Sequence, residues 1–198
     1  RSTRFPRPIL SRPPRTVTIP GRGETPSFRW GLRIGASGIQ DRWGDVPYAD
    51  DLGRALTDLG QQVVITRHGG HNQSSAYLED VTLTIRGAEP AAPHAGRINV
   101  LWVISRSERV SVGEVRSYDA VFAASPSWAA WMSEQSGRPV HVLLQATAPE
   151  RFHPSVTPAS RAEDVLFVGG PRLNEGGRPI VNAALDAGFR VGLWGGKW

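Results

Sequence analysis

A parallel α/β fold is predicted by three features of this 198-residue sequence. From residue 29 onward, short apolar segments alternate with segments of helical periodicity, as in repeated βαβ units. A stretch rich in proline and small polar residues, 149–163, divides these units into two runs, and the second run ends after one βαβ unit. We therefore expect a Rossmann-like parallel-sheet domain over 28–148, a linker over 149–163, and the first βαβ unit of a second, incomplete Rossmann-like domain over 164–198.

Strands of the first domain are expected where apolar and β-branched residues cluster. These segments are 30–36, 62–66, 81–85, 97–105, 118–125 and 140–145. A helix is predicted over 47–59, because its leucines recur at helical spacing, Pro47 suits the first turn and Gly60 suits the stop. A second helix is expected after Ser125, whose hydroxyl can cap it, and before Gly137.

The second domain is expected to contain a strand over 164–170, a helix over 180–187 and a strand over 189–194. One βαβ unit cannot cover both faces of its own sheet. The remainder of this domain is therefore expected to be absent, disordered or supplied by another chain, which gives a possible oligomer or partner chain.

Composition limits the class of protein. Hydrophobic residues make up 39% and charged residues 21% of the chain, which is enough for a real core. There is no cysteine, so disulfides, thiolate metal sites and cysteine nucleophiles are excluded. No apolar run approaches the ~18 residues of a membrane span, and the start lacks an apolar signal core. We expect a cytoplasmic protein without a transmembrane segment.

Residues 1–27 are predicted to form an extended arm rich in arginine and proline. Six prolines in this stretch handicap both ladder hydrogen bonding and helix formation. The arm is either a solvated tail or a segment that packs on a partner. Because five of its arginines account for much of the net charge of +5, we expect no nucleic-acid binding.

The first candidate ligand loop is 35–44, which follows the first predicted strand. It matches neither the dinucleotide pattern G-x-G-x-x-G nor a P-loop, so a standard dehydrogenase or P-loop ATPase is not expected. The backbone at Ser37 and Gly38 can still approach a ligand closely, while Asp41, Arg42 and Asp45 supply charge. The alternative is a plain βα turn with surface charges.

Three residues are candidates for proton transfer. His68 and His71 follow the second predicted strand, and an imidazole titrates near neutrality. A metal site would need further ligands, and no metal is expected. Glu108 follows another strand end, where a carboxylate could orient an acceptor hydroxyl or act as a base. The alternatives are an ordinary polar loop for the histidines and a helix-capping role for Glu108.

A diphosphate site is predicted in the second domain. Gly169, Gly170, Arg172 and Arg178 lie between a strand and a helix, where backbone amides and arginine forks suit an anion. The alternative is a flexible loop with solvated arginines.

Taken in order, these segments resemble the group 1 glycosyltransferases of the GT-B fold, especially the spore-maturation-protein-like branch. The resemblance runs from about residue 32 to 198 and rests on short matches in a fixed order. They are Leu101-Trp102, Ser105 to Glu108, Tyr118 to Ser125, Arg151 to Pro154, Phe167 to Gly169 and Gly195 to Trp198. Arg106 and Ser107 depart from the family, because they replace a His-Pro pair and so put the role of Glu108 in doubt.

The resemblance implies a hexosyltransferase-type enzyme that moves a sugar from a nucleotide-sugar donor to an unknown acceptor, without a cofactor. The first domain would hold the acceptor, and Arg172 with Arg178 would face the donor diphosphate. Since the later donor-binding part of the family is missing, the chain is expected to be inactive alone. The alternative is a non-catalytic Rossmann-like module that docks a partner protein through its arginine-rich arm.

Overall fold

The computed structural model describes residues 13–35, 44–153, 163–171 and 177–196. The chain divides into two compact units, Arg1–Ala148 and Pro149–Trp198. Each unit is treated by itself.

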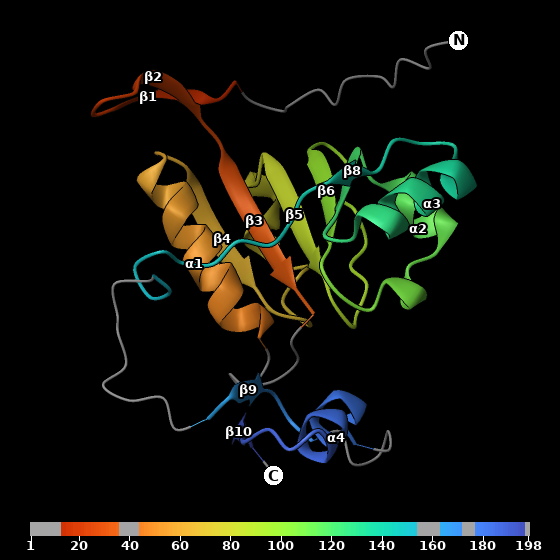
Figure 1. The fold of residues 1–198 in the computed structure, drawn as a ribbon. Helices are drawn as coiled ribbons and strands as arrows, with labels where there is room; N and C mark the ends of the chain where they lie inside the picture. The colour runs from red at the N-terminus through yellow and green to blue at the C-terminus, as the bar shows by residue number, and fades with distance from the viewer. Residues whose placement is uncertain (1–12, 36–43, 154–162, 172–176, 197–198) are drawn as a thin grey trace. The chain divides into compact units, whose positions relative to one another are not determined.

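The first unit is built on a six-stranded parallel sheet (Figure 1). Its strands are β3 (Arg29–Ile34), β4 (Gln62–Thr66), β5 (Val81–Arg86), β6 (Ile98–Val103), β7 (Ala120–Ala123) and β8 (His141–Val142). The strand order is β4-β3-β5-β6-β7-β8, and every neighbouring pair is parallel. The predicted Rossmann-like α/β architecture is therefore confirmed for this unit. The direction of winding reverses between β3 and β5.

One face of the sheet is apolar and is covered by α1 (Asp45–Asp58), which lies in front of β3 and β4 in Figure 1. Leu32, Ile34 and Ile85 are buried on this face together with Ala49 of the helix. Trp102 also belongs to it and lies against Tyr48, with 5.6 Å between ring centroids. We call this the α1 face.

The opposite face is apolar only over β6 and β7. There α2 (Val112–Ser117) and α3 (Pro126–Ser136) pack on a cluster that includes Leu101, Val121 and Met132. The predicted helix ends are confirmed: the Ser125 hydroxyl accepts a hydrogen bond from the Trp128 amide at 3.4 Å, and Gly137 closes α3 at φ +65°.

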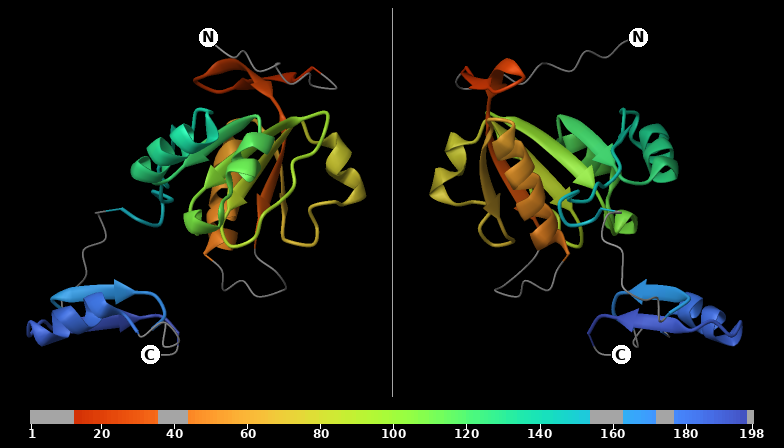
Figure 2. Two further views of the ribbon diagram at one scale, coloured as in Figure 1. Left: turned by 90° about the vertical axis from the view of Figure 1, so that its right-hand side faces the viewer. Right: turned by 60° about the vertical axis from the view of Figure 1, so that its left-hand side comes forward.

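Under β3 and β5 the same face is polar. Arg33 and Arg86 are 1% and 2% exposed, and Thr82 and Thr84 lie beside them. The short 3-10 helix η1 (Ser74–Leu78) lies on this side of the sheet, opposite α1 (Figure 2). The connection from β5 to β6, residues 87–97, contains no helix in the described structure. We call this region the polar face.

The expectation of an extended arm without ladder bonding is wrong for residues 15–27. They form an antiparallel hairpin of β1 (Arg15–Ile19) and β2 (Gly23–Ser27). The reason is that β1 alternates threonine with valine and isoleucine, whereas Pro20 falls in the turn, where no ladder donor is needed. Residues 1–12 lie outside the described part.

Three further elements were not expected, and a fourth is shorter than expected. Sequence reasoning missed η1, η2 (Ser107–Arg109) and α2. The strand expected over 140–145 is reduced to the two residues of β8. The carbonyl of Leu143 instead accepts a hydrogen bond from the Trp102 indole at 2.9 Å, so the chain leaves the sheet and crosses the α1 face.

The second unit has the predicted strand, helix and strand. Parallel strands β9 (Val165–Val168) and β10 (Val191–Trp194) are connected through α4 (Pro179–Asp186). Many of its large apolar side chains are exposed, as expected for a sheet with few elements to cover it. They are Val165, Leu166, Val168, Ile180, Leu185, Phe189, Leu193 and Trp194.

Candidate functional site

The carboxyl edge of the first sheet is the place to look for a ligand, because doubly wound sheets bind ligands outside the carboxyl ends of their strands. The carboxyl ends of the six parallel strands lie along this edge, and they bring together the histidine loop after β4, Gly87 after β5 and the turn after β6. Ser37 and Gly38, which were predicted to approach a ligand, lie outside the described residues.

His68 and His71 lie together, with ring centroids 5.9 Å apart and the rings edge to face. The His71 Nε2 lies 3.1 Å from the carbonyl oxygen of Ile34, and its ring also hydrogen-bonds the backbone of Thr66. Burial lowers the pKa of His71, the hydrogen bond to Ile34 opposes this shift, and the nearby Arg33 charge adds to it. These two contacts of His71 tie the ends of β3 and β4 together, whereas His68 is exposed.

Glu108 does not share a site with the histidines. It lies in η2, after β6, and β5 separates that strand from β3. Its side chain is 64% exposed and forms a long ion pair of 3.9 Å with Arg106. In this structure Glu108 is a surface carboxylate; its proposed role toward an acceptor stays a prediction.

Asp45 is better placed than Glu108 to accept a proton at this edge of the sheet, although the sequence suggested only a charge at this position. It begins α1, and a Cβ added to Gly87 would lie 2.8 Å from its Oδ2 and 3.6 Å from the Ser105 hydroxyl. A side chain at position 87 would therefore require the Asp45 carboxyl group to shift. Burial raises the pKa of Asp45. A half-buried acid with a raised pKa at a strand edge is a candidate proton acceptor.

A cavity of about 210 Å³ opens beside Ser105, at the carboxyl ends of β6 and β7. Its polar lining consists of Ser105, Ser107, Ser125 and Gln145, and Trp128 supplies the aromatic wall. These residues lie on three separate connections, which is why no single motif marked them. Ser125 was recognised only as a helix cap.

Gln145 is held at the cavity by its neighbours. The Leu143 carbonyl is bonded by the Trp102 indole, and the backbone of Ala146 hydrogen-bonds Tyr48. Both aromatic rings belong to the core of the α1 face. The backbone on either side of Gln145 is therefore fixed to the rigid part of the unit.

In the second unit, the predicted diphosphate residues lie at the carboxyl end of β9. Arg178 is the residue before α4, and its Nε donates to the Gly170 carbonyl at 2.8 Å. Its guanidinium carbon lies 5.2 Å from the centre of the Phe167 ring. Gly169 has φ +151°, and its amide donates to Trp194 at 2.7 Å. Arg172 lies outside the described residues.

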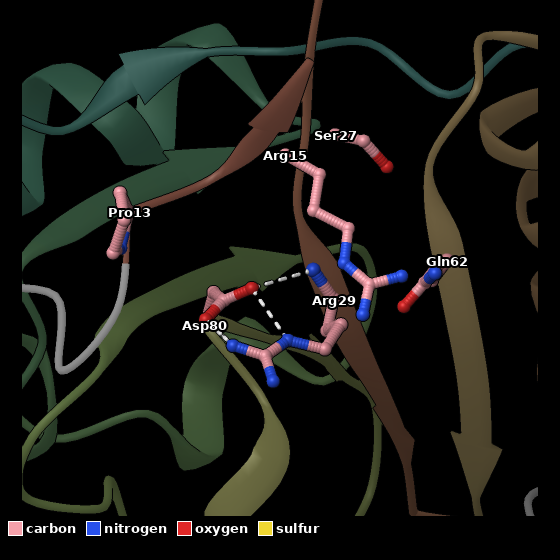
Figure 3. Close-up of a pocket in the computed structure, with 6 residues that line it drawn as sticks. All are labelled: Pro13, Arg15, Ser27, Arg29, Gln62 and Asp80. Atoms are coloured by element: carbon pink, nitrogen blue, oxygen red, sulfur yellow. Dashed lines mark hydrogen bonds and ion pairs between the residues drawn. The ribbon is translucent and has the colours of Figure 1, made fainter. Parts of the chain in front are cut away.

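A smaller hollow of about 90 Å³ lies at the opposite, amino edge of the first sheet (Figure 3). Asp80 there accepts hydrogen bonds from the amide and the Nε of Arg29, both at 2.9 Å, and its other oxygen pairs with the same guanidinium. Arg15, from the hairpin, points into the same space. Because Asp80 fastens the start of β3 to β5, this hollow is a structural junction at the wrong edge for a ligand.

Within the described ranges, no group of three or more histidine, aspartate or glutamate side chains could hold a metal ion. None of the helices described there is long and apolar enough to cross a bilayer.

Comparisons with known proteins assign this chain to no family. No family model matches the chain, and no curated protein matches it. Among solved structures, a flavodoxin of Streptococcus pneumoniae TIGR4 covers 62% of this chain and 88% of its own, with 12% identity and a TM-score of 0.30. A TM-score this low bears on neither fold nor function. The class of the protein therefore rests on its own geometry, a parallel α/β protein of Rossmann type.

Proposed function

We propose that the protein is a glycosyltransferase that uses a nucleotide-sugar donor. The observation that carries the proposal is the contact between the end of β9 and the start of α4: Gly169 and Gly170 follow the strand, and Arg178, the residue before the helix, donates from its Nε to the Gly170 carbonyl at 2.8 Å. A glycine turn opening onto a helix N-terminus, with an arginine fork beside it, is suited to a diphosphate. The first unit supports the proposal with a cavity and a half-buried acid at the matching edge of its sheet.

By the resemblance, the first unit would bind the acceptor and the second unit would bind the donor diphosphate. An acceptor hydroxyl would form a bond to the anomeric carbon of the donor sugar, while the bond from that carbon to the diphosphate oxygen breaks. The hydroxyl proton would pass to a base, for which Asp45 is the better placed group and His68 the second. The leaving diphosphate takes the electron pair, and Arg178 would offset the charge that develops on it.

Calorimetric titration of the full chain with UDP, GDP, ADP, CDP and dTDP tests the proposal. We expect one diphosphate to bind, and Arg178→Ala to weaken its binding about ten-fold or more, since a charge-assisted hydrogen bond contributes about 1.5–3 kcal/mol. Arg178→Lys keeps the charge but loses the fork and should fall between the two.

Arg190 provides the matched control. It lies in the same unit but at the amino edge of β9 and β10, where it forms an exposed ion pair with Asp164 at 2.9 Å. Arg190→Ala should leave diphosphate binding unchanged. If no diphosphate binds, the enzyme proposal fails, and a non-catalytic module that docks a partner through residues 1–27 becomes the better interpretation.

A further inference from the structure

We propose that the cavity at the carboxyl ends of β6 and β7 binds a single neutral, hydroxyl-rich ring, such as one sugar unit or a cyclic polyol. The binding claim stands on the cavity itself. Only the assignment of that ring as the acceptor rests on the proposed glycosyltransferase function.

The chemistry of the cavity wall selects the ligand class. Three serine hydroxyls and the Gln145 amide can each donate and accept hydrogen bonds, as the hydroxyls of a sugar do. Trp128 offers an apolar ring surface on which the C–H face of a sugar can lie. None of the described residues that line the cavity is charged, so no side chain in the lining neutralises a phosphate or a carboxylate.

The size of the cavity limits the ligand to one ring. The cavity has a volume of about 210 Å³. Sites for drug-sized molecules typically enclose ~300–1,000 Å³. A nucleotide or a disaccharide would have to extend beyond the described walls.

The turn between Ser105 and Ser107 supplies a second indication. Arg106 has φ +52° and ψ +38°, and it is the one residue other than glycine with positive φ in the described part of the chain. For an ordinary residue this conformation costs about 1 kcal/mol. Arg106 stands between Ser105 and Ser107, and both of these serines line the cavity.

The walls are also rigid, as a binding site requires. Ser125 caps α3 and is fixed by the Trp128 amide, and Gln145 is held between two anchored residues. A ligand would therefore meet preformed hydrogen-bonding groups.

Saturation-transfer NMR on the full chain tests this inference. The probes are methyl β-D-glucopyranoside, methyl β-D-galactopyranoside and myo-inositol, with glucuronate and glucosamine as charged matches. We expect at least one neutral probe to show saturation transfer and the charged analogues to show much less. Equal transfer to glucuronate, or none to any neutral probe, would overturn the inference.

Two variants locate the site. Ala124→Leu places a side chain in the cavity and should abolish transfer. Gln145→Leu changes an exposed residue with little effect on folding and should weaken the neutral probe about two- to ten-fold, the worth of one hydrogen bond. Gln135→Leu, an exposed glutamine on α3 outside the cavity, should change nothing. If Gln145→Leu and Gln135→Leu behave alike, the ring does not bind in this cavity.

The two proposals fail separately. Loss of diphosphate binding with retained sugar binding would remove the transferase function and leave the cavity as a sugar site. Diphosphate binding without sugar binding would leave the transferase and refute this cavity as the acceptor site.

Discussion

The α1 face and the polar face of the first sheet are both covered by other parts of the chain, but the first buries apolar side chains and the second buries charged and polar ones. On the α1 face, a helix with satisfied backbone groups covers apolar side chains such as Leu32 and Ile85. On the polar face, irregular chain covers β3 and β5, and irregular chain has backbone carbonyls that need donors. Arg33 donates to the carbonyl of Ala92 at 3.3 Å, and Arg86 donates to the carbonyls of Gly87 and Arg109.

The buried arginines are balanced by acids that the fold brings to them. Glu79 accepts from Arg97 at 2.8 Å and from Arg33 at 3.3 Å, and Glu114 pairs with Arg86 at 2.7 Å. A Cβ at Gly31 would overlap the Glu79 carboxyl group, so glycine is what admits this acid beneath β3. The difference teaches that the nature of the crossover, helix or loop, decides whether a parallel strand is apolar on that side.

The largest effect is expected from Glu79→Gln, which should lower the free energy of unfolding by about 3–5 kcal/mol. The substitution keeps the volume of the side chain but leaves two guanidinium groups buried, at 1% and 7% exposure, without their carboxylate. Burial already lowers the pKa of Arg33, and the Glu79 charge opposes that shift. Denaturant unfolding monitored by circular dichroism measures the loss.

Arg54→Ala is the control for this prediction. Arg54 pairs with Asp51 at 3.0 Å on α1 but is 68% exposed, so its removal should cost less than about 1 kcal/mol. If Glu79→Gln were as mild as Arg54→Ala, the polar face would hold together without its charges, and the contrast between the faces would be one of composition only.

Sequence patterns predicted the elements of the α1 face best. The helix over 45–58 and strand 62–66 follow from leucine spacing and from Gly60, which are local features. The polar face shows in the sequence as alternation: in Val81-Thr-Leu-Thr-Ile-Arg86 every second residue is polar, which is unusual in a buried parallel strand. Sequence analysis predicted the strand but not the polar face, because the position of Glu79 and the loop 87–97 that covers this face are set by tertiary contacts.

The candidate site was less predictable than the fold. The cavity draws its wall from residues 103 to 145, and only the parallel sheet order brings them together. Asp45 was noticed as a charge, but its carboxyl group lies beside Gly87, which is 42 positions away in the chain. The His68 and His71 pair was found because the two residues are close in the sequence. The contacts of His71 with the backbone of β3 and β4 are tertiary and could not be predicted from the sequence.

An intermediate effect is expected from Tyr118→Phe, which probes how the loop over the polar face is held. The Tyr118 hydroxyl donates to the carbonyl of Ala91 and also lies 3.3 Å from the Thr84 hydroxyl. Without it a buried carbonyl loses its donor, at a cost of about 1–2 kcal/mol. In the Tyr118→Phe variant, hydrogen exchange should show that the amides of 87–97 lose more protection than the amides of β3 and β5. Tyr77→Phe, at an exposed tyrosine, is the matched control, and equal protection in both variants would contradict the role given to Tyr118.

The smallest effect is expected from Asp45→Asn, which tests the charge on the α1 side of the sheet. Burial raises the pKa of Asp45 above its ordinary value of 3.8, so the folded state disfavours the ionised form. The wild-type protein therefore loses stability as the pH rises through the folded pKa, and keeps it below the unfolded value. Asp45→Asn should stabilise the protein at pH 7, and the gain should shrink toward zero as the pH falls below about 3.8.

A variant that is less stable than wild type at pH 7 would mean that the carboxylate is held by attractive contacts, as Glu79 is, and would remove the contrast between the two acids. Asp58→Asn, at an exposed position of the same helix, gives the baseline for losing one surface charge.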